Sequence, residues 1–235
     1  MLLLAVLALS SPGAVILFGD LSPTGNYSAW SSQIAILGSG VQTIDFESHP
    51  LGALNPGYYP GVTMTPSGDV NTVTAGAGPG QGNDSSTPLS SGEGAYPASN
   101  YLIDGGSPSS LTISFGSPVY GAGLFIIDYF NPAPGDNALT LEAFTGPNGT
   151  GTSLGVVNSV AYNFQNNNMY FMGIVSTLGD IGSVVFNDVN SSGGDTTGID
   201  NISFSGAGGA QIPEPSTFVL LGAALGVLGL RLRKR

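Results

Sequence analysis

The chain has 235 residues, of which only 4 are Lys or Arg and 15 are Asp or Glu, so its formal net charge is −11. It contains 37 Gly, 16 Pro, one His and no Cys. The lack of Cys excludes a disulfide framework, a thiolate nucleophile and a Cys-ligated zinc site, and the lack of a basic patch excludes a nucleic-acid-binding protein, because phosphates would find no cations.

The chain begins with a signal-like segment, residues 1–14, in which an apolar run precedes the small residues Ser, Pro, Gly and Ala. Secretory signal peptides have this arrangement, although the positively charged start that usually opens them is missing here. We expect delivery to the Sec translocon and cleavage near Ala14, with an N-terminal anchor as the alternative. Residues 15–40 form an N-terminal extension, and its first residues, Val15–Phe18, are either a first strand or a continuation of the apolar run.

Residues 41–205 show the pattern of an all-β domain. Apolar and polar residues alternate in Leu111–Phe115 and Leu139–Phe144, as in strands with one buried face, and turn-forming Gly, Pro, Asn and Asp residues lie between the segments. Helical periodicity is missing outside the two ends of the chain. The expected strands are Val41–Glu47, Gly61–Thr65, Asp69–Ala75, Asn100–Asp104, Ser110–Phe115, Val119–Tyr129, Ala138–Thr145, Ser153–Val160, Asn168–Ser176, Gly182–Asp188 and Gly198–Ser205.

So many short strands, separated by turns, predict a β-sandwich of jelly-roll type. Gly76–Gly94 interrupts them as a long polar run, which we expect to be a surface loop. Three segments, Ile44–Glu47, Tyr59–Thr63 and Gly198–Phe204, are similar to the jelly rolls of galactose-binding and carbohydrate-binding modules. The resemblance implies the fold more than the function, since jelly rolls host many functions.

The same resemblance implies a structural calcium ion that joins the first and last strands. The matching residues are Asp45, Glu47 and Asp200. In an alternating strand Asp45 and Glu47 fall on one face, and no Lys or Arg occurs in the first 230 residues to neutralise them. Carboxylates held close without a counter-charge favour the uptake of a cation, and Ca²⁺ prefers such oxygen ligands. The alternative is that both side chains point to solvent.

Sugar-binding sites use aromatic ring faces with a few polar groups. The tyrosines near loops or strand ends are Tyr58, Tyr59, Tyr96, Tyr101, Tyr129 and Tyr162. Core packing explains them equally well. Catalysis is not expected, because the single histidine, His49, has no nucleophile-elbow motif near it and phosphate chemistry would lack a Lys or Arg clamp. A pair of carboxylates for glycoside hydrolysis cannot be recognised from sequence spacing alone.

The last segment, residues 212–235, has three parts in a fixed order. A Pro-Glu-Pro motif comes first, an apolar Gly-rich run follows at Phe218–Leu230, and the cations of the chain come last: Arg231, Arg233, Lys234 and Arg235. Cations that flank an apolar helix stay on the cytoplasmic side, so the residues before this helix would lie outside. The helix would rise ~24 Å against a hydrocarbon core of ~30 Å, which favours a transient or processed span. The alternative is a buried C-terminal helix of a soluble domain.

This order of motif, apolar helix and basic end resembles the PEP-CTERM sorting tail of Gram-negative bacteria. The resemblance implies that exosortase, a membrane-embedded peptidase, recognises Pro213, Glu214 and Pro215 and removes the tail. Two prolines fix φ and remove two N–H donors, so the motif stays extended, which suits a peptidase cleft. The resemblance also implies anchoring in the inner membrane through the C-terminal helix, and then a cell-surface or matrix location. Residues 206–211 are expected to be a flexible linker.

We therefore interpret the sequence as an exported, acidic protein of the cell surface or of an exopolysaccharide-associated extracellular matrix. It would be structural or adhesive and non-catalytic, with the Sec translocon, exosortase and the membrane as partners. A carbohydrate-binding module that tethers cell or matrix to polysaccharide is the first alternative, and a carboxylate-dependent glycosidase is the second. A glycan-binding survey distinguishes the structural or adhesive protein from the carbohydrate-binding module. Measured turnover would identify the glycosidase.

Overall fold

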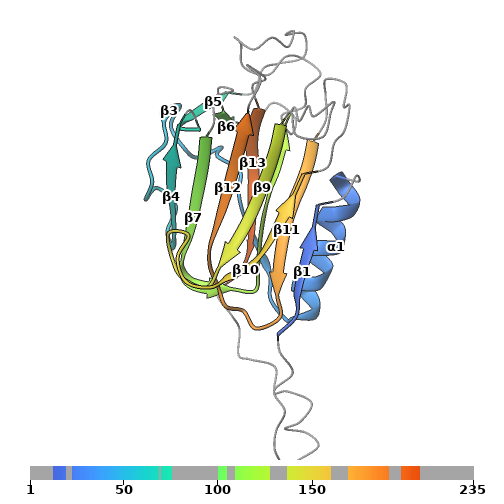
Figure 1. The fold of residues 1–235 in the computed structure, drawn as a ribbon. Coiled ribbons are helices and arrows are strands. Elements are labelled where there is room, and N and C mark those ends of the chain that lie inside the picture. Colours follow the sequence, from blue (N-terminus) through green and yellow to red (C-terminus); the bar gives the residue numbers. More distant parts are fainter. Residues whose placement is uncertain are drawn as a thin grey trace, which may run out of the picture.

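In the residues that the structure describes, the fold is a two-layer β-sandwich with one helix, α1 (Pro23–Ile36), on its outside (Figure 1). The computed structural model describes residues 13–19, 23–68, 70–75, 100–104, 109–127, 137–159, 169–190 and 197–206. The predicted all-β sandwich is confirmed at this level, and the finer jelly-roll assignment stays a prediction. Three predicted segments lie outside the described residues: the loop Gly76–Gly94, nearly all of the signal-like segment, and the sorting tail with most of its linker. In the part of the chain that is described, no helix is both long and apolar enough to cross a membrane.

One layer is an antiparallel sheet of eight strands. Along the main path the neighbours are β1 (Val15–Phe18), β11 (Met169–Ser176), β8 (Gly121–Ile127), β13 (Thr197–Ser205), β6 (Asn100–Asp104), β5 (Thr72–Ala75) and β3 (Gly52–Ala53). A further strand, β2 (Val41–Ile44), pairs with the C-terminal half of β13, with Ile44 opposite Ile202. The first and last strands of the predicted domain are therefore direct neighbours.

The other layer is an antiparallel sheet of five strands. Its order is β10 (Ser153–Asn158), β9 (Asn137–Phe144), β12 (Ile181–Asn190), β7 (Ser109–Val119) and β4 (Val62–Ser67). The two sheets enclose the larger apolar core. Alternation along β7 places Leu111 and Ile113 in this core, while Thr112 between them is only partly buried on the opposite face. The alternation that the sequence shows in this strand is thus the alternation of the folded sheet.

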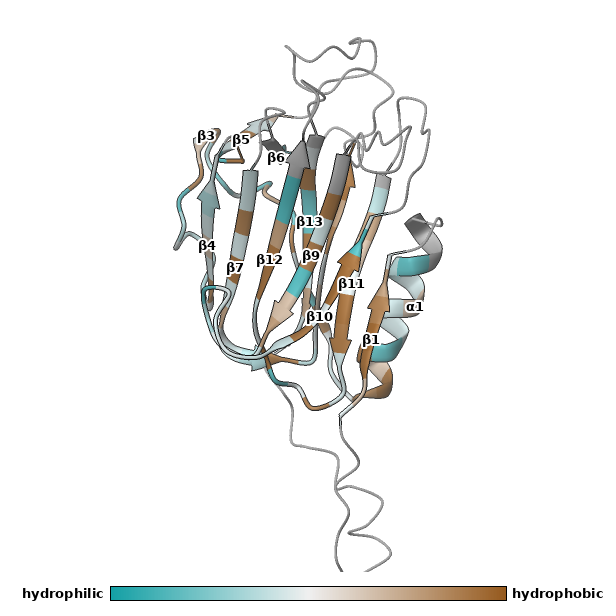
Figure 2. Cartoon of the chain, viewed as in Figure 1, coloured by the Kyte–Doolittle hydropathy of each residue, from teal (hydrophilic) through white to brown (hydrophobic). Residues whose placement is uncertain are grey.

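A second, smaller core lies on the outer face of the eight-stranded sheet, where α1 (Pro23–Ile36) packs beside β1 and β11. Trp30 and Ile34 of the helix lie fully buried against Phe125 and Phe171. The Trp30 Nε1–H donates to the Ile174 carbonyl at 3.2 Å. Figure 2 shows the apolar colouring of β1 and β11, next to a helix whose visible surface is more polar. Because the helix covers one face of β8 and the main core the other, every residue of β8 is buried.

The close approach of this helix needs small residues beneath it. A Cβ added at Gly173 would lie 2.8 Å from the Trp30 Cδ1 atom, closer than real Cβ contacts allow. The sequence analysis found no helical periodicity outside the two ends of the chain and did not predict α1. The described part of the sandwich starts at Val15, within the segment that the domain prediction assigned to an N-terminal extension, because β1 pairs with β11.

Candidate functional site

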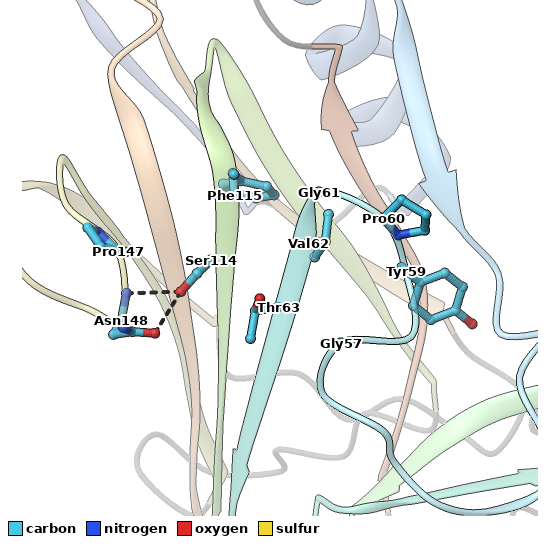
Figure 3. Close-up of a pocket in the computed structure, with 11 residues that line it drawn as sticks. Gly57, Tyr59, Pro60, Gly61, Val62, Thr63, Ser114, Phe115, Pro147 and Asn148 are labelled. Atoms are coloured by element: carbon cyan, nitrogen blue, oxygen red, sulfur yellow. Dashed lines mark hydrogen bonds between the residues drawn. The ribbon is translucent and has the colours of Figure 1, made fainter.

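A groove of about 420 Å³ lies at the end of the β4–β7 pair (Figure 3). It is bounded by the loop before β4, by the first residues of β4, by the middle of β7 and by the β9–β10 turn. The lining residues are Gly57, Tyr59, Pro60, Gly61, Val62, Thr63, Ser114, Phe115, Gly116, Pro147 and Asn148. None of them carries a charge. The groove therefore offers hydroxyl, amide and backbone groups beside apolar carbon.

Two glycines set the geometry of the groove floor. Gly61 has a φ of 77°, which places it in the left-handed region that favours glycine. The Gly116 N–H donates to the Gly61 carbonyl at 2.8 Å, and a Cβ at Gly116 would come within 3.3 Å of that oxygen. The loop before β4 is thereby held against the bend of β7, next to the exposed Thr63.

The opposite wall of the groove is a turn that serine side chains fix to the sheet. The Asn148 N–H donates to the Ser114 Oγ atom at 2.9 Å, and Ser114 Oγ–H can donate in return to Asn148 Oδ1 at 3.1 Å. The Gly149 N–H donates to Ser183 Oγ at 3.0 Å, and that hydroxyl donates to the Gly146 carbonyl at 2.6 Å. Asn148 itself is exposed, so its amide can meet a ligand in the groove.

The groove continues over the end of the sandwich into a second hollow of about 390 Å³. The two share Pro60, Gly61, Phe115 and Gly116, and the second adds Gln42, Ser117, Val119 and Phe204. The rings of Phe115 and Phe204 lie 5.4 Å apart between centroids. Apolar surface with a few convergent polar groups is the usual composition of a small-molecule site. An uncharged lining suits a neutral, hydroxyl-rich ligand.

His49 lies beneath the loop at the groove and is 4% exposed. Its Nδ1 atom contacts the Pro50 carbonyl at 2.6 Å, and its Nε2 atom accepts the Asn55 N–H at 3.1 Å. A carbonyl can only accept and a backbone N–H can only donate, so the ring carries its proton on Nδ1. Both nitrogens thus hold the loop in place, and the Tyr58 ring packs on the imidazole at 4.7 Å.

Tyr59, in the same loop, lies near two of the predicted calcium ligands, Asp45 and Asp200. Burial raises the pKa of Tyr59 to about 12, with the negative charges of Asp45 and Asp200 adding to the effect and the Ser48 side chain opposing it. No hydrogen bond of ordinary geometry reaches the buried Tyr59 hydroxyl from the described residues. The two aspartates are therefore close enough to Tyr59 to act on its charge.

Of the three predicted calcium ligands, Asp45 and Glu47 follow β2 and are exposed, while Asp200 lies in β13. Each carboxylate accepts at least one hydrogen bond from the protein itself. Asp45 Oδ1 accepts the Glu47 N–H at 3.2 Å, and Glu47 Oε1 accepts the Asn100 N–H at 2.7 Å. Asp200, which is 1% exposed, accepts both the backbone N–H and the side-chain amide of Asn201. Each of the three carboxylates therefore has a hydrogen-bond partner in the protein without a metal ion.

The strand alternation on which the calcium prediction rested does not extend to Asp45 and Glu47. β2 ends at Ile44, short of the predicted Glu47, and Phe46 has a φ of 58°. Among the described residues, no group of three or more His, Cys, Asp or Glu side chains is arranged to hold a metal ion. The calcium site stays a prediction.

Of the tyrosines that the sequence offered as sugar platforms, Tyr58 and Tyr59 lie in the loop at the groove, and Tyr59 lines it. Tyr101 is fully buried in the sandwich. Tyr96, Tyr129 and Tyr162 lie outside the described residues, as do the sorting residues Pro213, Glu214 and Pro215 and the terminal cations. Sequence reasoning gave no binding role to Thr63, Ser114 or Asn148, although Thr63 ended the Tyr59–Thr63 segment of the resemblance and Asn148 lay in the Pro-Asn-Gly turn at 147–149.

Comparison with protein families decides the nature of the C-terminal segment. The family described as "PEP-CTERM protein-sorting motif" matches residues 211–235. The chain carries a PEP-CTERM sorting motif. The PEP-CTERM motif implies an exported protein that is sorted through its C-terminal segment and processed by exosortase. No curated protein matches the sequence.

Several solved structures are similar to the sandwich. The K3 cleaved adhesin domain of Lys-gingipain from Porphyromonas gingivalis is 13% identical, with 69% of this chain and 97% of that chain covered and a TM-score of 0.42. The K2 cleaved adhesin domain is 12% identical, with 81% and 99% covered and a TM-score of 0.36. The enzymatically active domain of bacteriophage CBA120 tailspike protein 4 is 15% identical, with 66% and 21% covered and a TM-score of 0.36. Scores this low do not identify a function.

Proposed function

We propose that the protein is an exported, non-catalytic structural or adhesive component of the cell surface or of an exopolysaccharide-associated matrix. The observation that carries this proposal is the PEP-CTERM motif at 211–235, with every Lys and Arg of the chain placed behind its apolar run. The C-terminal helix anchors the newly exported chain in the inner membrane with its cations inside. Exosortase then removes the tail and frees the sandwich.

The charge of the exported part supports this assignment. The chain carries −11 with its four cations, so residues 1–230, which hold all 15 acids and no Lys or Arg, carry −15 with a neutral His. The negative electrostatic potential of this charge repels anionic polymers and anionic membrane surfaces. Attachment to a matrix then relies on neutral polysaccharide, on bridging cations or on other proteins.

The non-catalytic assignment is supported by the groove and by His49. The groove lining has no charged side chain, so it lacks an acid–base pair of the kind that glycoside hydrolysis uses. Both ring nitrogens of His49 hold the loop backbone, which leaves neither nitrogen to accept a proton from a nucleophile. Binding is the chemistry that such a surface favours.

A fractionation experiment tests the sorting. The full chain is expressed in a Gram-negative host that contains an exosortase and in the same host without it. We expect a shortened product at the surface or in the matrix of the first host, and a full-length product in the membrane fraction of the second. Glu214→Ala should behave in the first host as the wild type does in the second. Identical products and locations in both hosts would contradict the proposal.

A carbohydrate-binding module is the second candidate, and the uncharged groove favours it. A neutral polysaccharide offers hydroxyls to Asn148 and Thr63 and apolar ring faces to the exposed Pro60. A groove without cations offers no ionic attraction to acidic sugars, and the net charge of the domain opposes them. The expected ligand class is therefore a neutral glycan.

Matched threonine variants test this candidate. Thr63 lines the groove, while Thr65, two residues along β4, is also exposed but lies outside it. Loss of one hydrogen bond of about 1 kcal/mol should weaken glycan binding ~5-fold in Thr63→Val and leave it unchanged in Thr65→Val. The assay is retention of the exported protein on immobilised neutral and acidic polysaccharides. Equal retention of the two variants, or preference for acidic polymers, would rule the groove out.

A further inference from the structure

Ala14 immediately precedes the edge strand β1, and its backbone is already hydrogen-bonded to the neighbouring chain segment. Its N–H donates to Thr177 Oγ1 at 2.9 Å, and its carbonyl accepts the Thr177 N–H at 3.0 Å. The next residue, Val15, pairs with Ser176, and the pairing continues to Phe18. Both backbone groups of Ala14 therefore hold it next to the folded sheet.

Gly13, by contrast, lies against the side chain of Leu178, which is 51% exposed. Removal of Gly13 would uncover surface that is already largely in contact with water, so it costs the fold little. Among the described residues, the backbone hydrogen bonding of this edge thus begins at Ala14, just after the Gly13–Ala14 bond.

The sequence around this bond has the pattern that a leader peptidase reads. Small residues are needed at the last and third-last positions of a signal peptide. Ser11 and Gly13 satisfy both positions for cleavage before Ala14. Cleavage one residue later would place Pro12 at the third-last position. It would also remove Ala14, so that the Thr177 N–H and hydroxyl would lose their partners.

We propose that a leader peptidase hydrolyses the Gly13–Ala14 bond and that Ala14 is the first residue of the mature protein. Water adds across the amide: the C–N bond breaks, the Gly13 carbonyl becomes a carboxylic acid, and the Ala14 nitrogen takes the proton. At neutral pH this amine is mostly an ammonium, which still donates to Thr177 Oγ1. In a chain without Lys or Arg before Arg231, it is a rare positive group.

This inference rests on export, which is part of the proposed function, and the intact mass of the exported protein tests it. Digestion with trypsin is unsuitable, since the chain has no Lys or Arg before Arg231. We expect a product that starts at Ala14 whether or not the host contains an exosortase. A product that starts at Met1, at Val15 or at any other residue would overturn the inference. Fragmentation in the mass spectrometer identifies the two ends of the protein separately. A product that starts at Ala14 and still ends at Arg235 would contradict removal of the tail but not cleavage before Ala14.

Two neighbouring variants provide the matched control. Gly13→Val places a branched side chain at the position before the cut, where a small residue is needed, and should reduce processing at least several-fold. Ala14→Val changes the residue after the cut and should be processed at the same bond as the wild type. Gly13 faces the half-exposed Leu178 side chain, which can move aside. Equal processing of both variants, or a block in both, would overturn the assignment of this bond.

Discussion

Tyr59 is a residue through which alkaline pH should lower the stability of the fold. Burial raises its pKa to about 12 in the folded protein, whereas a tyrosine in the unfolded chain loses its proton near ~10. Since folding favours the neutral phenol, this contribution is complete below pH ~10 and is lost as the pH rises toward ~12. The sign follows from a folded pKa that lies above the unfolded one.

Tyr59→Phe should therefore flatten the alkaline part of the stability curve. The free energy of unfolding of the wild type should fall more steeply than that of the variant between pH ~10 and ~12. Urea unfolding at a series of pH values measures both slopes. Parallel curves for the two proteins would show that the Tyr59 hydroxyl titrates alike in both states.

The predicted calcium site is tested at the carboxylates. If Ca²⁺ binds the folded chain at Asp45, Glu47 and Asp200, it must raise the melting temperature by mass action. The exported protein should then melt at a higher temperature with Ca²⁺ than with EDTA, and Asp45→Asn should lose most of this increase. Glu142→Gln, on the exposed face of the five-stranded sheet, is the control and should keep it. Unchanged melting with Ca²⁺ leaves the carboxylates with only their hydrogen bonds to the chain.

For individual residues, the sequence indicated which segment lies at the groove but did not indicate which side chains line it. The Tyr59-Pro-Gly segment attracted attention as part of a resemblance, and the structure places it at the groove. Thr63 ended the Tyr59–Thr63 segment, but the place of Thr63 and Ser114 in the groove could not be predicted, because a small hydroxyl in a strand resembles any other surface residue until the strand register is known. Their strands pair with Thr63 opposite Ser114, which no local pattern encodes.

At the element scale, α1 makes the clearest prediction. Trp30 is fully buried, packs on Phe171 with ring centroids 5.6 Å apart, and donates to a sheet carbonyl. Trp30→Ala should lower the free energy of unfolding by ~3–5 kcal/mol. Ile36→Ala, at a position that is 66% exposed on the same helix, should change it by less than ~0.5 kcal/mol.

Urea unfolding followed by circular dichroism measures both helix variants, since the chain has no other Trp to report by fluorescence. A Trp30→Ala protein as stable as Ile36→Ala would mean that the helix does not dock on the sheet in solution. An intermediate value would mean that the cavity closes as Phe171 and Tyr27 move into it, which the partial relaxation of large-to-small variants allows.

All eleven predicted strands correspond to strands in the structure, although several boundaries differ by a few residues. Strand alternation and turn residues are local signals, so a linear reading finds them. The helix was missed because Gly25, Asn26 and several serines dilute its pattern. Its apolar residues Tyr27, Trp30 and Ile34 do follow helical spacing. The two-residue β3 is too short to show any period.

At the scale of the whole molecule, the order of the strands in each sheet could not be predicted from the sequence. β1 pairs with β11, so Val15 meets Ser176 across most of the chain, and β8 lies between β11 and β13. Such pairings depend on which apolar faces meet when both sheets and the helix close together. Charge segregation, in contrast, is a property of the linear chain, and it led directly to the sorting tail at 211–235.

The proposed sorting requires that the chain crosses a membrane, is held by its last segment and is then cut free. The most direct measurement is the C-terminal mass of the protein recovered from the surface or matrix of a Gram-negative host that contains an exosortase. We predict an end close to Pro213–Pro215, with Phe218–Leu230 and the four cations removed. A full-length product in the cytosol, with Arg235 intact, would contradict the account.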